Sequence, residues 1–116
     1  MTVAREEVFG PVMSVLTYDN VDDAVELAND TSYGLHGGIF TSDLARGLEV
    51  AKRVVTGTIT INAYGTHPSA PFGGVKDSGV GREHGPEGIA TFCELKTYVI
   101  PKDLYQTLAA SGLPEG

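Results

Sequence analysis

The feature that most constrains the fold is an alternation of strand-like and helix-like stretches. Residues 10–18, GPVMSVLTY, follow a Gly-Pro break and are typical of a strand. Residues 21–30 and 43–55 repeat apolar side chains at helical spacing, and each is followed by a short β-rich stretch, at 38–41 and 58–62. Strands that alternate with helices predict parallel pairing through crossover connections, so we expect an α/β fold.

Polar residues mark where the two expected helices begin. Asp19 or Asn20 precedes the first, and Thr41 or Ser42 precedes the second. Side-chain oxygens of these residue types accept hydrogen bonds from the free N–H groups of a first helical turn. Both helices should therefore start with a side-chain cap.

The carboxy-terminal part predicts one more helix and one more strand. Residues 86–94 begin with a proline suited to a first helical turn, and residues 95–100, LKTYVI, are typical of a strand that ends at Pro101. A sheet of three parallel strands is thin, and two helices cover only part of it, whereas parallel sheets are normally covered on both faces. The expected fold is therefore a partial parallel sheet, and the chain looks incomplete.

The stretch 72–85, FGGVKDSGVGREHG, has the glycine density of a phosphate-binding loop but lacks its spacing. Gly79 and Gly81 form G-x-G, yet Gly85 comes one residue too late for a dinucleotide fingerprint. Gly74 and Gly79 have the Walker interval, but no lysine and hydroxyl follow. These glycines predict a tight irregular turn with close backbone approach.

Composition excludes several classes of function. The 116 residues suffice for one domain, carry a net charge of −7 and contain no basic stripe, so nucleic-acid binding is not expected. No apolar run is long enough to cross a membrane, and residues 1–10 do not form a secretory signal, so we expect no membrane association and a cytoplasmic location.

Side chains that could perform catalysis are isolated from one another. Cys93 has Glu94 beside it and no histidine near it in sequence, so we expect a structural, buried cysteine and no catalytic residue. The three histidines, His36, His67 and His84, show no metal-ligand spacing, and no metal is expected. Ser78 lies outside any nucleophile motif and is expected to bond its own backbone.

Two adjacent acids, Glu6 and Glu7, precede the first expected strand and leave two interpretations open. They could form a solvated acidic turn. Alternatively, one carboxylate could accept hydrogen bonds from ligand hydroxyls, as acidic residues do with a ribose, with Phe9 offering a ring face to a planar group.

Five motifs decide between these interpretations. The motifs REEVFGPV, ANDTSYGL, GTITIN, PFGGVKDSGVGREHG and ELKTYVI stand in this order between residues 5 and 100. In this order and spacing the chain closely resembles the carboxy-terminal portion of the NAD(P)-dependent aldehyde dehydrogenase superfamily, over essentially residues 3–100.

The resemblance implies roles for five residues. In that family the position of Glu7 holds the hydroxyls of the nicotinamide ribose, and that of Phe9 contacts the nicotinamide side of the cofactor. The position of Phe72 lines the inner end of the aldehyde tunnel, and Thr66 and His67 belong to a loop that shapes substrate preference.

The resemblance also implies an organisation. Residues 1–94 correspond to the last part of the catalytic domain, 95–101 to an oligomerisation strand and 102–116 to a tail without an expected function. The nucleophilic cysteine, the general base and most contacts to NAD or NADP lie upstream in the family. The isolated chain is therefore expected to be inactive and not to bind the cofactor.

Two further hypotheses concern partners. The chain could be an interaction module that forms a homo-oligomer, or joins full-length subunits, through residues 95–100. It could also be a fragment that complements a separately encoded amino-terminal part. Unpaired edges and uncovered sheet faces motivate the interaction module. A few hundred Å² of exposed apolar surface costs several kcal/mol at about 25 cal/mol per Å², so the lone chain is expected to be marginally stable or to form oligomers.

Overall fold

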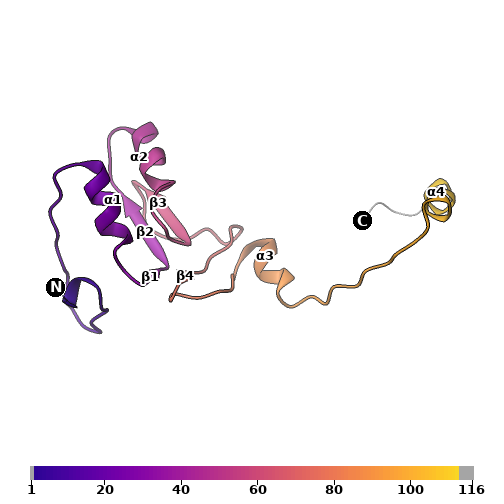
Figure 1. Cartoon of the computed structure of the whole chain (residues 1–116), viewed down its shortest axis with the longest axis horizontal. Helices are drawn as coiled ribbons and strands as arrows, with labels where there is room; N and C mark the ends of the chain where they lie inside the picture. Colours follow the sequence, from indigo (N-terminus) through magenta and orange to yellow (C-terminus); the bar gives the residue numbers. More distant parts are fainter. Residues whose placement is uncertain (1, 113–116) are drawn as a thin grey trace.

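The computed structural model describes residues 2–112 and contains short elements joined by long irregular segments (Figure 1). In chain order these elements are η1 (Thr2–Ala4), α1 (Val21–Asn29), β1 (Tyr33–Gly34), β2 (His36–Ile39), α2 (Leu44–Ala51), β3 (Thr58–Ile61), β4 (Val75–Lys76), α3 (Gly85–Ala90) and α4 (Lys102–Ala110).

Two small sheets hold the amino-terminal two thirds of the chain together. Strands β2 and β3 run parallel, in a register that pairs His36 with Thr58 and Ile39 with Ile61. Helix α2 lies between them in sequence and packs on β3. Strands β1 and β4 form a separate antiparallel pair. The α/β class and the parallel β2–β3 pair are confirmed, whereas the antiparallel pair was not predicted.

Both predicted helices form, and both have a side-chain cap. Asn20 Oδ1 accepts a hydrogen bond from the Asp23 N–H at 3.0 Å, as predicted for α1. Helix α2 is capped by Asp43, whose Oδ1 accepts from the Arg46 N–H at 3.0 Å. The prediction of Thr41 or Ser42 as this cap is wrong. Thr41 Oγ1 instead accepts from the Asp43 N–H at 3.1 Å and so orients the residue that caps the helix.

Two expected strands are not formed in the described part of the chain. Residues 12–18 and 94–100 have no regular secondary structure. A strand requires a neighbour to bond its backbone, and neither segment has one here. The prediction of a strand at 10–18 is therefore wrong for this structure, and strand formation at 95–100 stays a prediction that depends on a partner.

The carboxy-terminal helices also depart from expectation. Helix α3 ends at Ala90, four residues before the predicted end at Glu94. The tail, for which no structure was predicted, forms α4 over Lys102–Ala110, and its last four residues, 113–116, lie outside the described residues.

Almost no side-chain core closes within the described residues. Val25 is the only buried hydrophobic side chain among them, and the other buried residues are glycines. The accessible surface is 9533 Å², against about 6,100 Å² for a folded monomer of this mass. The radius of gyration is 21.4 Å, against about 13 Å for a compact domain of this length.

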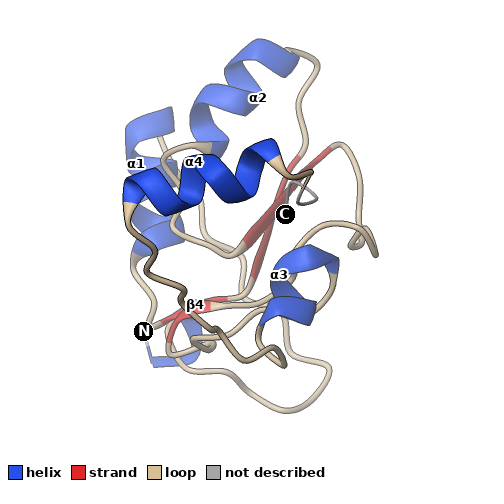
Figure 2. Ribbon diagram, turned by 90° about the vertical axis from the view of Figure 1, so that its right-hand side faces the viewer, coloured by secondary structure: helices blue, strands red, loops and turns tan. Residues whose placement is uncertain are grey.

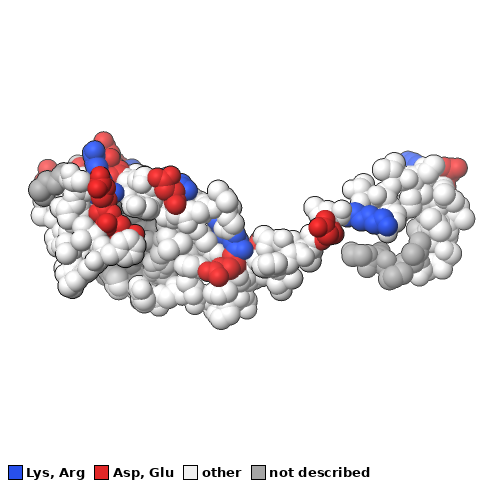
Figure 3. Space-filling model, turned by 90° about the horizontal axis from the view of Figure 1, so that it is seen from below, with Lys and Arg blue, Asp and Glu red and all other residues white. Residues whose placement is uncertain are grey.

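The excess surface follows from the shape. Figure 3 shows a body and a distant α4 end that are joined by a narrow neck of chain, with overall extents of 65 × 33 × 23 Å. Viewed along the long axis, the short strands and helices are separated by extended loops (Figure 2). No helix in residues 2–112 has the length and apolar character needed to cross a membrane.

Candidate functional site

The glycine-rich stretch 72–85 forms a closed hairpin. The backbones of Phe72 and Glu83 exchange two hydrogen bonds of 2.7 Å. Inside the hairpin, the Arg82 guanidinium donates through Nη1 to the carbonyl oxygens of Gly74 and Gly81, at 2.8 and 2.7 Å. The carbonyl oxygens of Gly74 and Gly81 therefore have hydrogen-bond donors within the hairpin, and the Arg82 guanidinium stabilises the turn.

Glycine is required at several points because backbones meet there. A Cβ atom at Gly57 would overlap the carbonyl oxygen of Gly73, and one at Gly34 would lie 2.8 Å from a methyl carbon of Val75. Gly79 has a φ of +136°, which side-chain-bearing residues rarely adopt. The prediction of a tight turn with close backbone approach is confirmed.

The hairpin carries Phe72, and the preceding loop carries Thr66 and His67. Phe72 is half-buried, with its ring centroid 6.2 Å from that of His84. Thr66 and His67 are exposed, and His67 Nδ1 accepts a hydrogen bond from the Ser69 N–H at 3.2 Å. The Gly85 N–H donates to the Pro68 carbonyl at 3.2 Å, which fastens this loop to the end of the hairpin.

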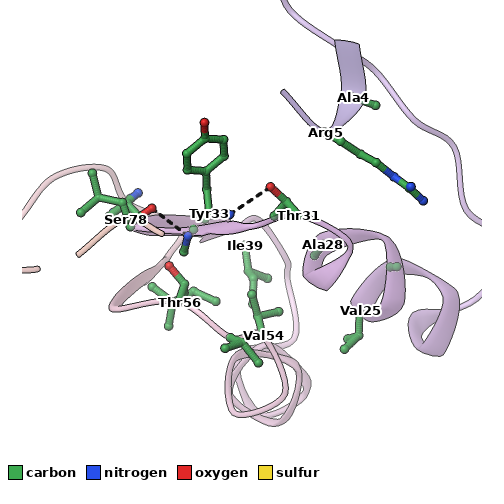
Figure 4. A pocket seen from close by; sticks show the side chains of 18 of the residues that line it. Ala4, Arg5, Val25, Ala28, Thr31, Tyr33, Ile39, Val54, Thr56 and Ser78 are labelled. Carbon is green, nitrogen blue, oxygen red and sulfur yellow. Dashed lines mark hydrogen bonds between the residues drawn. The ribbon is translucent and has the colours of Figure 1, made fainter. Parts of the chain in front are cut away.

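A separate pocket of about 780 Å³ lies where α1, β1, β2 and the end of α2 face residues 3–7 (Figure 4). Its lining is largely apolar and also includes the charged residues Arg5, Glu6 and Glu7. Apolar side chains in its lining include Val25, Ala28, Ile39, Val54 and Ile59. The Arg5 guanidinium forms a 2.6 Å ion pair with Asp30 across the α1 end of the pocket.

The structure separates the predicted site residues into two groups. Glu7 lines the 780 Å³ pocket, and its carboxylate has no hydrogen-bond partner among the described residues. Phe9 is 95% exposed and does not line this pocket, nor do Thr66, His67 and Phe72. The described residues therefore do not enclose the cofactor-side and substrate-side residues in one cavity.

Two residues that carry no motif, Lys76 and Asn29, bond the turn after α1 to the hairpin and to the start of β3. Lys76 has a φ of 52° and donates through Nζ to the backbone carbonyls of Asn29 and Thr31, at 3.0 Å each. The Asn29 side chain bonds the backbone of residues 53–55. Neither role has a local sequence signal, because each depends on segments that meet only after folding.

Two sequence interpretations need correction. Ser78 does not use its hydroxyl on its own loop, because Oγ accepts a hydrogen bond from the Gly34 N–H at 2.9 Å, across 44 positions. Cys93 is exposed, not buried, and its Sγ lies 3.5 Å from the Ile89 carbonyl oxygen. Cys93 follows α3 in irregular chain where the neighbouring Phe92 and Leu95 are also exposed, which explains the exposure. Within residues 2–112, no group of three or more potential metal ligands is found.

Comparison with known proteins agrees with the motifs. The sequence profile described as "Aldehyde dehydrogenase family" matches residues 1–98. A Staphylococcus epidermidis relative that is named as an aldehyde dehydrogenase is 54% identical over 97 residues, which are 84% of this chain and 20% of that protein. A betaine aldehyde dehydrogenase of Brucella anthropi is 50% identical over 101 residues, which are 86% of this chain and 21% of that protein.

The fold agrees as well. A crystal structure of a Mycobacterium tuberculosis aldehyde dehydrogenase complexed with NAD+ superposes with a TM-score of 0.84 and 46% identity, over 87% of this chain and 21% of that one. This chain belongs to the aldehyde dehydrogenase family. It spans about a fifth of the length of the relatives it matches.

Proposed function

We propose that these residues are the carboxy-terminal part of the catalytic domain of an NAD(P)-dependent aldehyde dehydrogenase. The observation that carries this proposal is the match over residues 1–98 to a family in which the aligned stretch makes up only 20% of a matched relative. In this role the segment supplies side chains that contact the cofactor and the aldehyde. Other parts of the enzyme supply the groups that make and break bonds.

The amino-terminal loop is proposed to hold the nicotinamide end of the cofactor. Glu7 offers a carboxylate that accepts no hydrogen bond from the described residues, and ribose hydroxyls are suitable donors for it. Phe9 offers a ring with both faces open, against which a planar nicotinamide can lie. A bound nicotinamide supplies the hydride acceptor for aldehyde oxidation.

The hairpin is proposed to line the inner end of the aldehyde tunnel. Phe72 is held in the hairpin by its backbone pair with Glu83 and lies near the His84 ring, and this fixed position supports the proposal. Thr66 and His67 lie on the loop that is fastened to the same hairpin, which suits residues that discriminate among aldehydes. One matched relative is named for betaine aldehyde, and which aldehyde this chain serves depends on residues of that loop.

A polypeptide of these 116 residues is proposed to be inactive alone. Oxidation through a thiol adduct needs a nucleophilic cysteine beside a general base. Cys93 follows α3, does not line the 780 Å³ pocket, and has only a backbone carbonyl as hydrogen-bond partner of its sulfur. The single thiol is compatible with the reducing conditions of a cytoplasmic location.

The test is a turnover assay on the purified chain with NAD+ or NADP+ and a series of aliphatic, aromatic and betaine aldehydes. We expect no formation of reduced cofactor above the blank. A rate that scales with this polypeptide, with intact full-length enzyme excluded by mass spectrometry, would overturn the proposal. Cys93→Ser is the matched variant, because a genuine rate that it abolishes would identify Cys93 as the nucleophile.

A second proposed function is assembly through residues 95–100. Leu95, Tyr98 and Val99 are exposed, and no backbone hydrogen bond satisfies residues 95–100 within the described chain. An extended segment of this kind can add a strand to the edge of another sheet. The partner is another copy of the chain or a full-length or complementary aldehyde dehydrogenase subunit.

A further inference from the structure

The turn that follows α1 is hydrogen-bonded on two sides to segments that are distant in sequence. Residues 29–34 lead from the end of α1 into β1, and they lie between the α2–β3 connection and the glycine hairpin. Few apolar side chains are buried here, so polar contacts fix how these three segments are placed.

Asn29 bonds the first of these neighbours with both ends of its amide. Its Nδ2 donates to the Arg53 carbonyl at 2.9 Å, and its Oδ1 accepts from the Val55 N–H at 2.8 Å. The Asn29 side-chain amide thereby bonds backbone groups of residues 53 and 55, as a neighbouring strand would. Arg53 adds an ion pair of 2.6 Å with Asp22 in the first turn of α1.

Lys76 bonds the same turn from the hairpin side. Its Nζ donates to the carbonyl oxygens of Asn29 and Thr31, both at 3.0 Å. Helix α1 has no basic residue in its own last turn, so Lys76 brings a cation to the negative end of the helix dipole from 47 positions away. The φ of Lys76 is 52°, in the left-handed region, where a residue other than glycine has a strained backbone.

We propose that Lys76 and Asn29 form a clamp that positions the glycine hairpin against α1 and the β2–β3 sheet. Lys76 fixes the hairpin to the α1 turn, and Asn29 fixes that turn to the start of β3. The backbone bond from the Asp77 N–H to the Ser32 carbonyl, 2.9 Å, and the bond from the Gly34 N–H to Ser78 Oγ lie beside the clamp, next to the β1–β4 pair, and their exchange therefore reports on it.

The consequence for function rests on the function proposed above. Because Phe72 begins the hairpin, a positioning residue that holds the hairpin also sets where Phe72 stands relative to the loop that carries Glu7. Lys76 is thus a positioning residue for the aldehyde-side surface, although it does not contact that surface.

The clamp is tested by amide hydrogen exchange of the 116-residue chain, followed by NMR in a sulfate buffer that strengthens apolar burial. Lys76→Met removes the ammonium group and keeps most of the side-chain stem. We expect exchange at Gly34 and Asp77 to accelerate roughly fivefold or more, as for loss of a charge-assisted hydrogen bond. Amides inside α2 should change less than twofold.

Two comparisons separate positioning from general stability. Lys76→Arg, which keeps a cation, should restore slow exchange at Gly34 and Asp77, whereas Lys102→Met, on the distant α4, should leave it unchanged. Equal acceleration in the hairpin and in α2, or failure of Lys76→Arg to restore protection, would overturn the proposal.

Exchange of lysine ammonium protons with water tests the clamp in the unaltered chain. The Nζ protons of Lys76 should exchange with water more slowly than those of Lys102, because two carbonyls hold them. Equal exchange at the two ammonium groups would overturn the clamp. None of these readouts depends on cofactor or turnover, so their outcome is independent of the activity test.

Discussion

At the scale of single residues, Gly57 leaves no space for a side chain. The position just before β3 faces the Gly73 backbone so closely that a Cβ would overlap its carbonyl oxygen. Gly57→Ala should therefore force the hairpin off the sheet and cost about 3 kcal/mol or more of the free energy of unfolding.

Gly10→Ala is the matched control for this prediction. No atom lies within 4 Å of a Cβ built at Gly10, and its φ is not in the left-handed region. We expect Gly10→Ala to unfold at the same urea concentration as the parent chain, within error. Urea titrations followed by circular dichroism compare the two, and equal midpoints for both variants would contradict the packing described for Gly57.

The role of a single residue can be predicted from sequence when its partners are its sequence neighbours. The glycine spacing of 72–85 excluded phosphate loops and predicted a tight turn, because turn geometry depends on the residues themselves. The roles of Lys76 and Asn29 could not be predicted, since their partners are 45 to 47 and 24 to 26 positions away. The roles of Glu7, Phe9, Thr66, His67 and Phe72 came from the family resemblance and stay predictions.

At the scale of elements, α1 depends on its first turn. It has nine residues, and helices of this length are marginal without tertiary support. Asn20→Ala removes the oxygen that accepts from the Asp23 N–H and should cost about 1 kcal/mol of the free energy of unfolding. Urea unfolding followed by circular dichroism measures the loss.

Asn20→Asp keeps the capping oxygen and adds a charge that the helix dipole favours. It should therefore unfold at or above the midpoint of the parent chain. If Asn20→Asp lost as much stability as Asn20→Ala, side-chain capping would not be the contribution of this residue.

Helices were predicted better than strands for a physical reason. A helix satisfies its backbone within one segment, so apolar spacing predicts α1 and α2 from local sequence, although the cap of α2 is Asp43 and not Thr41 or Ser42. A strand needs a neighbour, and residues 10–18 and 95–100 have strand-like composition without one in this structure. The prediction of the parallel strand β3 is confirmed, because its partner β2 belongs to the same chain and bonds its backbone.

The strand proposed at 95–100 can be tested through its backbone. Thr97→Pro together with Val99→Pro removes two N–H groups that would bond a neighbouring strand, and it should abolish association through this segment. Size-exclusion chromatography with light scattering should then show a lower mass than for the parent chain at equal concentration.

The matched control keeps those N–H groups and changes the side chains. Thr97→Ser with Val99→Thr should retain the parent mass if backbone pairing drives assembly. A mass lowered equally by both pairs of substitutions would indicate side-chain contact, and an unchanged mass in the proline variant would contradict strand addition.

At the scale of the whole molecule, exposed surface governs behaviour. The chain exposes 9533 Å², more than half again the area expected for its mass. The excess of about 3,400 Å² is larger than the 1,200–2,000 Å² that a typical specific interface buries in total. Exposed aromatic side chains such as Phe9, Tyr64 and Phe92 contribute to this area.

We therefore expect the thermal midpoint of the 116-residue chain to rise with protein concentration. Self-association favours the folded state by mass action and buries apolar area at about 25 cal/mol per Å². Calorimetry over a hundredfold range of concentration, with light scattering at each point, measures both the midpoint and the mass. A monomer with one concentration-independent, cooperative transition would show that these 116 residues close a core of their own. In that case the exposed apolar area would not drive association, and the chain would be stable without a partner.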